Sequence, residues 1–192
     1  MKHAQIVSGI KLLFDRKGAS LYGGEAVTQL EHALQAAAMA ESSGADADAI
    51  VAALLHDVGH LLHDLPDDAP DAGMDDVHEE RASTWLLKYF GPEVTEPVRM
   101  HVAAKRYLCA ADPEYYASLS DASRQSLQLQ GGAFDHEQRR QFEQQPFFEQ
   151  AVELRRWDDE AKVVGLETPL LDHFLEYVNQ ASRSVEPAKV SP

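Results

Sequence analysis

The stretch that most constrains the fold of this chain is residues 52–60, which read AALLHDVGH. Its first four residues belong to an apolar run of the kind that forms a buried helix, and this run leads directly into His56 and Asp57. Burying an imidazole and a carboxylate without partners is strongly unfavourable, whereas a bound metal ion would supply the missing partner. On a helix, His60 shares a face with His56, and Asp57 is rotated by about 100° from His56. The stretch therefore predicts a buried helix that delivers metal-binding groups to the interior.

Apolar residues recur at helical spacing along the rest of the chain, and capping residues separate the segments. No segment shows the alternation of a half-buried strand, and no repeat or interdomain linker is visible. We expect helices over residues 6–18, 25–43, 46 or 48 to 62, 78–91 and from 92 onward, then at 112–116, from 120 or 121 to 131, and from 135, 146 and 168. Residues 64–76 contain six Asp and read as an acidic loop. The prediction is a single all-α domain over residues 1–192, with its core at about 20–182.

The charge of the chain limits its partners. Seventeen Lys and Arg against 32 Asp and Glu give a net charge of −15, which disfavours binding to nucleic acid and to anionic membranes. No apolar run reaches the roughly 18 residues of a membrane span, and the first residues do not resemble a signal peptide. The single cysteine excludes an internal disulfide and a zinc–thiolate cluster. We expect a cytoplasmic protein whose anionic ligands, if any, are held by local Lys or Arg.

Isolated histidines and one distant aspartate complete a possible metal site. The candidate ligands are His32, His56, Asp57, His78, His101 and Asp158. Imidazole together with carboxylate suits iron, manganese or zinc, and helical bundles assemble such sites from separate helices. The set is large enough for two ions with one bridging carboxylate. A single histidine is more often a surface or core residue than a ligand, so the combination carries the argument.

These residues resemble the HD-domain superfamily of metal-dependent helical bundles, in which the frame is His32, then His56-Asp57, then Asp158. Most members of that superfamily are phosphohydrolases. The additional His78 and His101 resemble its dinuclear branch. By that resemblance His32, His56 and Asp158 hold one metal ion, His78 and His101 hold the other, and Asp57 bridges the two.

Longer blocks resemble a narrower group, the mixed-valent diiron oxygenases that degrade organophosphonates. The blocks are YGGEAVTQLEH at 22–32, HVAAKRY at 101–107, LSDASR at 119–124, QGG at 130–132 and RRWD at 155–158. The resemblance implies two iron ions as an Fe(II)/Fe(III) pair and dioxygen as co-substrate. It implies cleavage of the C–P bond of a small organophosphonate, 1-hydroxy-2-aminoethylphosphonate or its N-trimethylated analogue. The products would be phosphate with glycine or glycine betaine. A trimethylammonium group offers only charge and methyl surface, which suits carboxylates and aromatic faces. The carboxylates of the acidic loop at 64–76 therefore slightly favour the trimethylated substrate.

The same blocks contain groups that suit such a substrate. The candidates for binding the phosphonate are His60, Lys105, Ser123, Gln130 and Arg155. Lysine and arginine would hold the anion through charge-assisted hydrogen bonds despite the acidic surface. Alternatively, Lys105 is a surface lysine, and Ser123 and Gln130 are ordinary helix-end residues.

Tyr22 and Glu25 best separate an oxygenase from a hydrolase, because a hydrolytic site with a metal-bound water needs neither. By its resemblance to these oxygenases, Tyr22 would be a temporary iron ligand. Glu25 would bind the ammonium group of the substrate and help to displace the tyrosine from the iron. The alternative is that Tyr22 packs on the core and that Glu25 lies in the first turn of a helix, where the dipole favours acids.

Three other functions remain open from the sequence. A phosphohydrolase acting on a nucleotide or phosphate ester would share every metal ligand and would release phosphate without using dioxygen. An oxygenase similar to inositol oxygenase would share the diiron core, but Lys105 and Arg155 favour a phosphonate. A non-catalytic helical module with a structural metal ion is the third.

Overall fold

The computed structural model describes residues 2–62 and 77–183, so the expected acidic loop at 64–76 lies outside the described residues. Within these ranges the chain forms eleven helices, and the one β-type contact is an isolated bridge between Leu21 and Thr28. The all-α prediction is confirmed. The helices are α1 (Lys2–Lys17), α2 (Gln29–Ser42), α3 (Ala47–Leu55), α4 (Val58–Leu61), α5 (His78–Leu86), α6 (Pro92–Ala111), α7 (Pro113–Ser118), α8 (Asp121–Leu129), α9 (His136–Phe142), α10 (Phe148–Glu160) and α11 (Leu171–Arg183).

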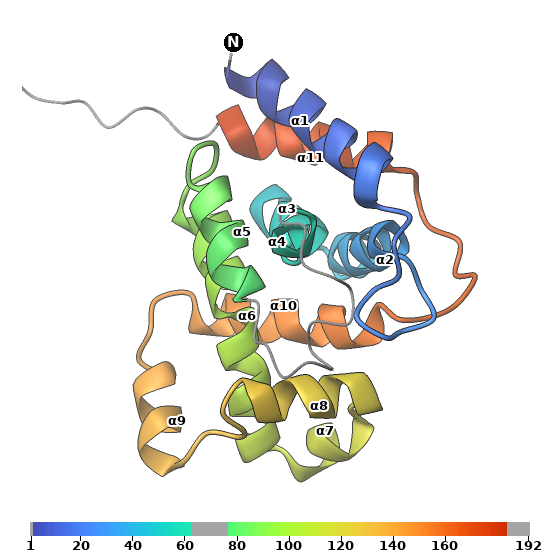
Figure 1. The fold of residues 1–192 in the computed structure, drawn as a ribbon. Coiled ribbons are helices and arrows are strands. Elements are labelled where there is room, and N and C mark those ends of the chain that lie inside the picture. The colour runs from blue at the N-terminus through green and yellow to red at the C-terminus, as the bar shows by residue number, and fades with distance from the viewer. Residues whose placement is uncertain (1, 63–76, 184–192) are drawn as a thin grey trace, which may run out of the picture.

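Helix α3 lies at the centre of the fold (Figure 1). Every residue from Ile50 to Leu55 is buried, and helix α3 as a whole contacts α2, α6, α10 and α11. Asp46 begins the helix by accepting a hydrogen bond from the amide of Ala49 at 2.9 Å. Helices α7, α8 and α9 gather at one end of α6, away from α1 and α11 (Figure 1). The apolar run before His56 is therefore the central helix of the core.

The structure corrects the expected single helix from residue 46 or 48 to 62. It is broken at His56 and Asp57 into α3 and the short α4. Asp57 has φ −101° and ψ 10°, outside the helical region, and its side chain makes no cap hydrogen bond to α4. The break leaves the Asp57 carboxylate directed at histidines from other helices instead of along one helix face.

The second helix begins at Gln29 and not at Glu25. Thr28 and Glu31 form a capping box, in which Thr28 Oγ1 accepts from the Glu31 amide at 3.2 Å and a Glu31 carboxylate oxygen accepts from the Thr28 amide at 2.7 Å. Gly23 and Gly24 have φ of 45° and 83° and form the preceding turn. Glu25 thus lies in a turn, so the placement of Glu25 in a first helical turn is wrong.

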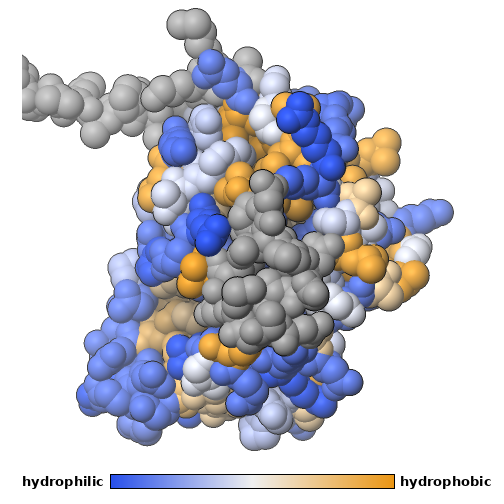
Figure 2. Space-filling view, in the orientation of Figure 1, coloured by the Kyte–Doolittle hydropathy of each residue, from blue (hydrophilic) through white to orange (hydrophobic). Residues whose placement is uncertain are grey.

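No helix among residues 2–62 and 77–183 is long and apolar enough to cross a membrane. Figure 2 shows hydrophilic side chains over most of the end formed by α7, α8 and α9. A hydrophilic surface of this kind is typical of a chain in which 26% of the residues are charged.

Candidate metal centre

The six predicted metal ligands come together in the interior, and all six are buried. They are His32 on α2, His56 at the end of α3, Asp57 between α3 and α4, His78 on α5, His101 on α6 and Asp158 on α10. Five separate elements therefore converge on one point, as expected for a metal site built inside a helical bundle.

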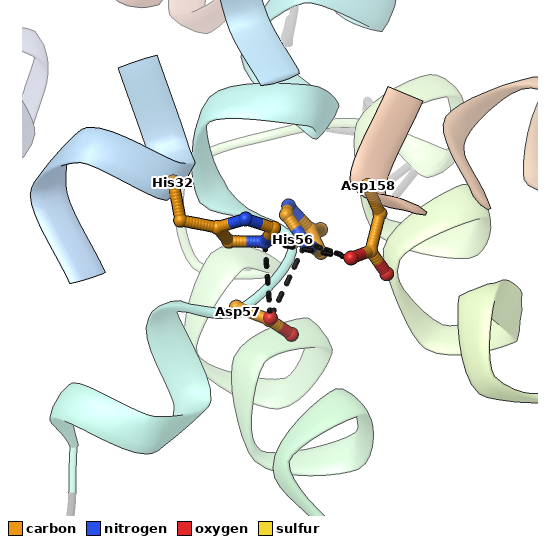
Figure 3. Close-up of side chains that lie close together, drawn as sticks. All are labelled: His32, His56, Asp57 and Asp158. Atoms are coloured by element: carbon orange, nitrogen blue, oxygen red, sulfur yellow. Dashed lines mark hydrogen bonds and ion pairs between the residues drawn. The ribbon is translucent and has the colours of Figure 1, made fainter. Parts of the chain in front are cut away.

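The first set consists of His32, His56, Asp57 and Asp158 (Figure 3). The Nε2 atoms of His32 and His56 are 3.1 Å apart. Asp57 Oδ2 lies 3.5 Å from His32 Nε2 and 3.3 Å from His56 Nε2, and Asp158 Oδ1 lies 3.5 and 3.7 Å from the same two atoms. These four side chains can offer one ion two nitrogen and two oxygen ligands.

The second set consists of Asp57, His78 and His101. The Nε2 atoms of His78 and His101 are 3.2 Å apart, and each is 3.3 Å from Asp57 Oδ1. The two carboxylate oxygens of Asp57 thus face different histidine pairs. This is the arrangement that a carboxylate bridging two metal ions requires.

The protonation of the histidines favours a cation between them. The Nδ1 atoms of His32, His56 and His101 lie 2.7–2.8 Å from the backbone carbonyls of Ala161, Ala53 and Val98. A carbonyl can only accept, so each Nδ1 carries the proton and a neutral ring presents a lone pair at Nε2. Facing lone pairs repel unless a proton or a metal ion lies between them.

Without metal, the pKa of His56 favours a proton in the first pair, whereas in the second pair burial lowers the pKa of His101. Burial alone would lower the pKa of His56, but the carboxylates of Asp57 and Asp158 raise it to about 10. Burial likewise opposes the ionised form of Asp57, yet His56, His101 and His32 hold the pKa of Asp57 well below its usual range. Among the described residues, Asp57 Oδ1 is a buried oxygen without a hydrogen-bond donor. A pair of metal ions fits this donor set, because it would satisfy that oxygen and both histidine pairs.

Of the predicted substrate residues, Lys105 and Ser123 are buried. Lys105 donates to Ser126 Oγ at 2.8 Å, and Ser126 in turn donates to the Ser123 carbonyl at 3.1 Å. Burial, followed by the charge of Arg155, lowers the pKa of Lys105 to about 7. This lysine is therefore a poorly compensated cation beside the proposed metal ligands.

Arg155 is held by carboxylates. Its Nη1 donates to Asp158 Oδ2 at 2.6 Å, its Nη2 pairs with Asp159, and its Nε donates to Asp159 at 2.9 Å and to Tyr115 at 3.1 Å. Asp158 and Asp159 hold the pKa of Arg155 above its usual value although burial opposes the charge. The guanidinium therefore fixes the orientation of Asp158, and direct contact of Arg155 with substrate stays a prediction.

The other two phosphonate candidates lie in different surroundings. The ring of His60 stacks on that of His78, with centroids 4.1 Å apart and planes at 22°. Gln130 lies in the wall of a separate pocket, with Arg99 and Arg106, and its buried Oε1 has no donor among the described residues. Their roles in binding substrate stay predictions.

Tyr22 covers the first set of ligands. Its ring stacks on His32, with centroids 3.8 Å apart and planes at 11°, and its hydroxyl donates to Asp158 Oδ1 at 3.4 Å. Burial, and then the charges of Asp158 and Asp57, raise the pKa of Tyr22 well above its usual value in the metal-free protein. This position agrees both with a Tyr22 that only packs on the core and with a Tyr22 that binds the metal ion.

Several polar residues of the site were missed from the sequence. They are Tyr115, Ser120, Ser126, Asp159 and Lys162. Asp159 could have been found, because it is four residues after Arg155 on one helix and such pairs share a face. The others come from separate elements, and no local spacing connects them to the site.

The chain matches one known domain family and is similar in sequence to three known proteins. Residues 30–125 match the family described as HD domain. The hydroxymethylphosphonate dioxygenase of Gimesia maris is 47% identical over 88% of this chain and 84% of its own length. The glycine-betaine-forming [1-hydroxy-2-(trimethylamino)ethyl]phosphonate dioxygenase of Leisingera caerulea is 43% identical over 94% and 92%. An uncharacterised mimivirus protein, L432, is 37% identical over 94% and 85%.

Proposed function

Because this chain belongs to the HD-domain family and is 43–47% identical to two proteins named as phosphonate dioxygenases, we propose that it is a diiron dioxygenase that cleaves the C–P bond of a 1-hydroxyphosphonate. The proposed substrates are 1-hydroxy-2-(trimethylammonio)ethylphosphonate and its primary-amine analogue, giving phosphate with glycine betaine or glycine. Hydroxymethylphosphonate, which has no cationic group, belongs in the same test because one relative is named for it.

The observation that carries the proposal is the pair of facing imidazoles on each side of Asp57. His32, His56 and Asp158 with Asp57 Oδ2 would hold one iron, and His78 and His101 with Asp57 Oδ1 would hold the other. Mixed nitrogen and oxygen ligands suit iron. When bound, the iron pair supplies the dioxygen chemistry that side chains cannot perform.

The residues of the chain bind and orient the substrate. Lys105 and Ser123 would hold the phosphonate, and Glu25 would meet a cationic group at its other end. Arg155 keeps Asp158 in place through the 2.6 Å ion pair. Tyr22 would protect the first iron until substrate enters, since its hydroxyl reaches Asp158 and its ring covers His32.

The reaction balances with one dioxygen per substrate. The hydroxylated carbon becomes a carboxylate, the phosphorus leaves as phosphate, each product gains one oxygen atom, and no other reductant is needed. We therefore expect iron-loaded protein to consume dioxygen and release phosphate in a ratio of about one, as a dioxygenase reaction requires. An oxygen electrode with a parallel phosphate assay measures both.

That experiment uses all three phosphonates and also separates the alternatives. Phosphate release without oxygen uptake would indicate a hydrolase. No phosphate and no oxygen uptake with any of the three would refute the proposed function, and nucleotides and phosphate esters would be tested next.

Tyr22→Phe tests the protective role of the tyrosine. Iron-loaded protein is expected to show a visible absorption band if the phenolate binds ferric iron, and the band should be absent from Tyr22→Phe. Tyr177→Phe, which changes a tyrosine bonded to Glu41, is the matched control and should keep the band. A band of equal intensity in Tyr22→Phe would exclude ligation by Tyr22.

Lys105 predicts a pH dependence. Burial and the charge of Arg155 lower the pKa of Lys105 to about 7 in the metal-free protein, and bound iron cations would lower it further, so the ammonium charge is lost as the pH rises. The KM for a phosphonate is expected to rise above about pH 7, by no more than about tenfold per pH unit. Lys105→Arg keeps its charge, so its KM should stay flat from about pH 7 to 9.

The control for this profile is Lys88→Arg, which alters an exposed lysine and should retain the wild-type dependence. An equal rise of KM with pH in wild type and Lys105→Arg would show that another group titrates.

A further inference from the structure

Lys162 is a second lysine in the substrate region, and the sequence patterns gave it no role. It follows the end of α10, and its side chain is 12% exposed. Its Nζ donates to Ser123 Oγ at 3.0 Å and lies 3.5 Å from Asp159 Oδ1. Because Ser123 is a proposed phosphonate ligand, this ammonium group borders the place where substrate would bind.

The same ammonium group also lies near the proposed cation-binding residue. Lys162 Nζ is 4.0 Å from Glu25 Oε1 and 5.9 Å from the centre of the Tyr22 ring. Glu25 Oε1 accepts a hydrogen bond from Ser120 Oγ at 2.5 Å. The start of α8 thus places one serine against Glu25 and a second against Lys162, which holds the two charged groups side by side.

We propose that Lys162 is an internal counter-ion of Glu25 that competes with the cationic group of a substrate. It thereby sets the preference between 1-hydroxyphosphonates with and without such a group. This inference rests on the proposed function.

The two substrate types meet different charges at Glu25. A substrate ammonium that approaches Glu25 must share the carboxylate with Lys162, and the two cations repel each other. A phosphonate without a cationic group leaves the Lys162–Glu25 pair intact, so the negative charge of Glu25 stays compensated near the phosphonate. Lys162 therefore favours the substrate without a cation and opposes the one that carries it.

Lys162→Gln keeps a donor for Ser123 and removes the charge. The ratio of kcat/KM for the trimethylammonio substrate to that for hydroxymethylphosphonate is expected to rise about fivefold, the effect of roughly one partly exposed ion pair. The ratio of dissociation constants should shift likewise when both phosphonates are titrated anaerobically into iron-loaded protein. A purely structural role for Lys162 would change both substrates by the same factor.

Three comparisons keep the test specific. Lys162→Arg retains the charge and should keep the wild-type ratio, and so should Lys88→Gln at an exposed position. In a Glu25→Gln background, Lys162→Gln should change the ratio by a smaller factor, because the competition for Glu25 is gone and only the direct repulsion between the two cations remains.

The outcomes separate this inference from the proposed function. If wild type turns over at least one of these phosphonates and the ratio is unchanged in Lys162→Gln, the role of Lys162 is wrong and the function stands. A fall in the ratio would also overturn the inference. If wild type neither binds nor oxidises any phosphonate, the proposed function fails and this inference falls with it.

Discussion

Asp57→Ala is expected to abolish dinuclear metal binding and turnover. Asp57 is the one ligand candidate shared by both sets, with Oδ2 at 3.3 Å from His56 and Oδ1 at 3.3 Å from both His78 and His101. Removing a residue that only supports a metal ligand typically lowers affinity by roughly 10–100-fold, so losing a shared ligand should exceed about 100-fold. Iron content per chain and coupled oxygen and phosphate measurements test this.

Two further variants make the Asp57 result specific. Asp57→Asn keeps the size of the side chain and should also lose metal, which separates ligation from packing. Asp172→Ala changes an exposed aspartate paired with Lys11 and should retain two irons. If Asp57→Ala kept two irons and full turnover, the dinuclear assignment would be wrong.

Gly59→Ala is expected to disrupt the second set of ligands selectively. A Cβ on Gly59 would lie 2.0 Å from the backbone oxygen of His78 and 2.7 Å from its carbonyl carbon, so α4 or the start of α5 must move. Overpacking of this kind destabilises proteins by about 1–3 kcal/mol, occasionally more. His78 would be displaced from His101, and iron content should fall from about two to about one per chain.

The matched control for Gly59→Ala is Gly9→Ala in α1. A Cβ at Gly9 meets nothing within 4 Å, and alanine in a helix should stabilise the protein by about 0.5–1 kcal/mol. Thermal unfolding and iron analysis of both variants test the prediction. If Gly59→Ala kept two irons and the stability of wild type, the backbone at His78 would have to move aside without affecting metal binding, and the prediction would be wrong.

The ligand candidates could be found from the sequence because their signals are local or belong to a recognisable pattern. The apolar run before His56 indicated burial, and burial of an imidazole beside a carboxylate demands a partner. The break between α3 and α4 was not predicted, because the helical spacing of apolar residues continues past Asp57 although the backbone at Asp57 is not helical. The late start of α2 was missed although Thr28 and Glu31 have capping-box spacing.

The contacts of the charged residues around the site could not be predicted from local sequence signals. Arg155 was expected to bind a phosphonate, and the structure surrounds it with Asp158, Asp159 and Tyr115. Lys162 received no role, since its neighbours Glu25 and Ser123 come from a distant turn and a different helix.

Local sequence signals were enough to predict that the chain is helical and which imidazoles and carboxylates are candidate ligands, because periodicity, caps and residue chemistry act over a few neighbouring residues. The packing of the helices, by contrast, makes the two oxygens of Asp57 face different histidine pairs, brings Gly59 against the His78 backbone and places Lys162 beside Glu25. These relations depend on how separate helices pack. A shift of a few ångströms between helices would change every one of them and leave the local sequence signals unchanged.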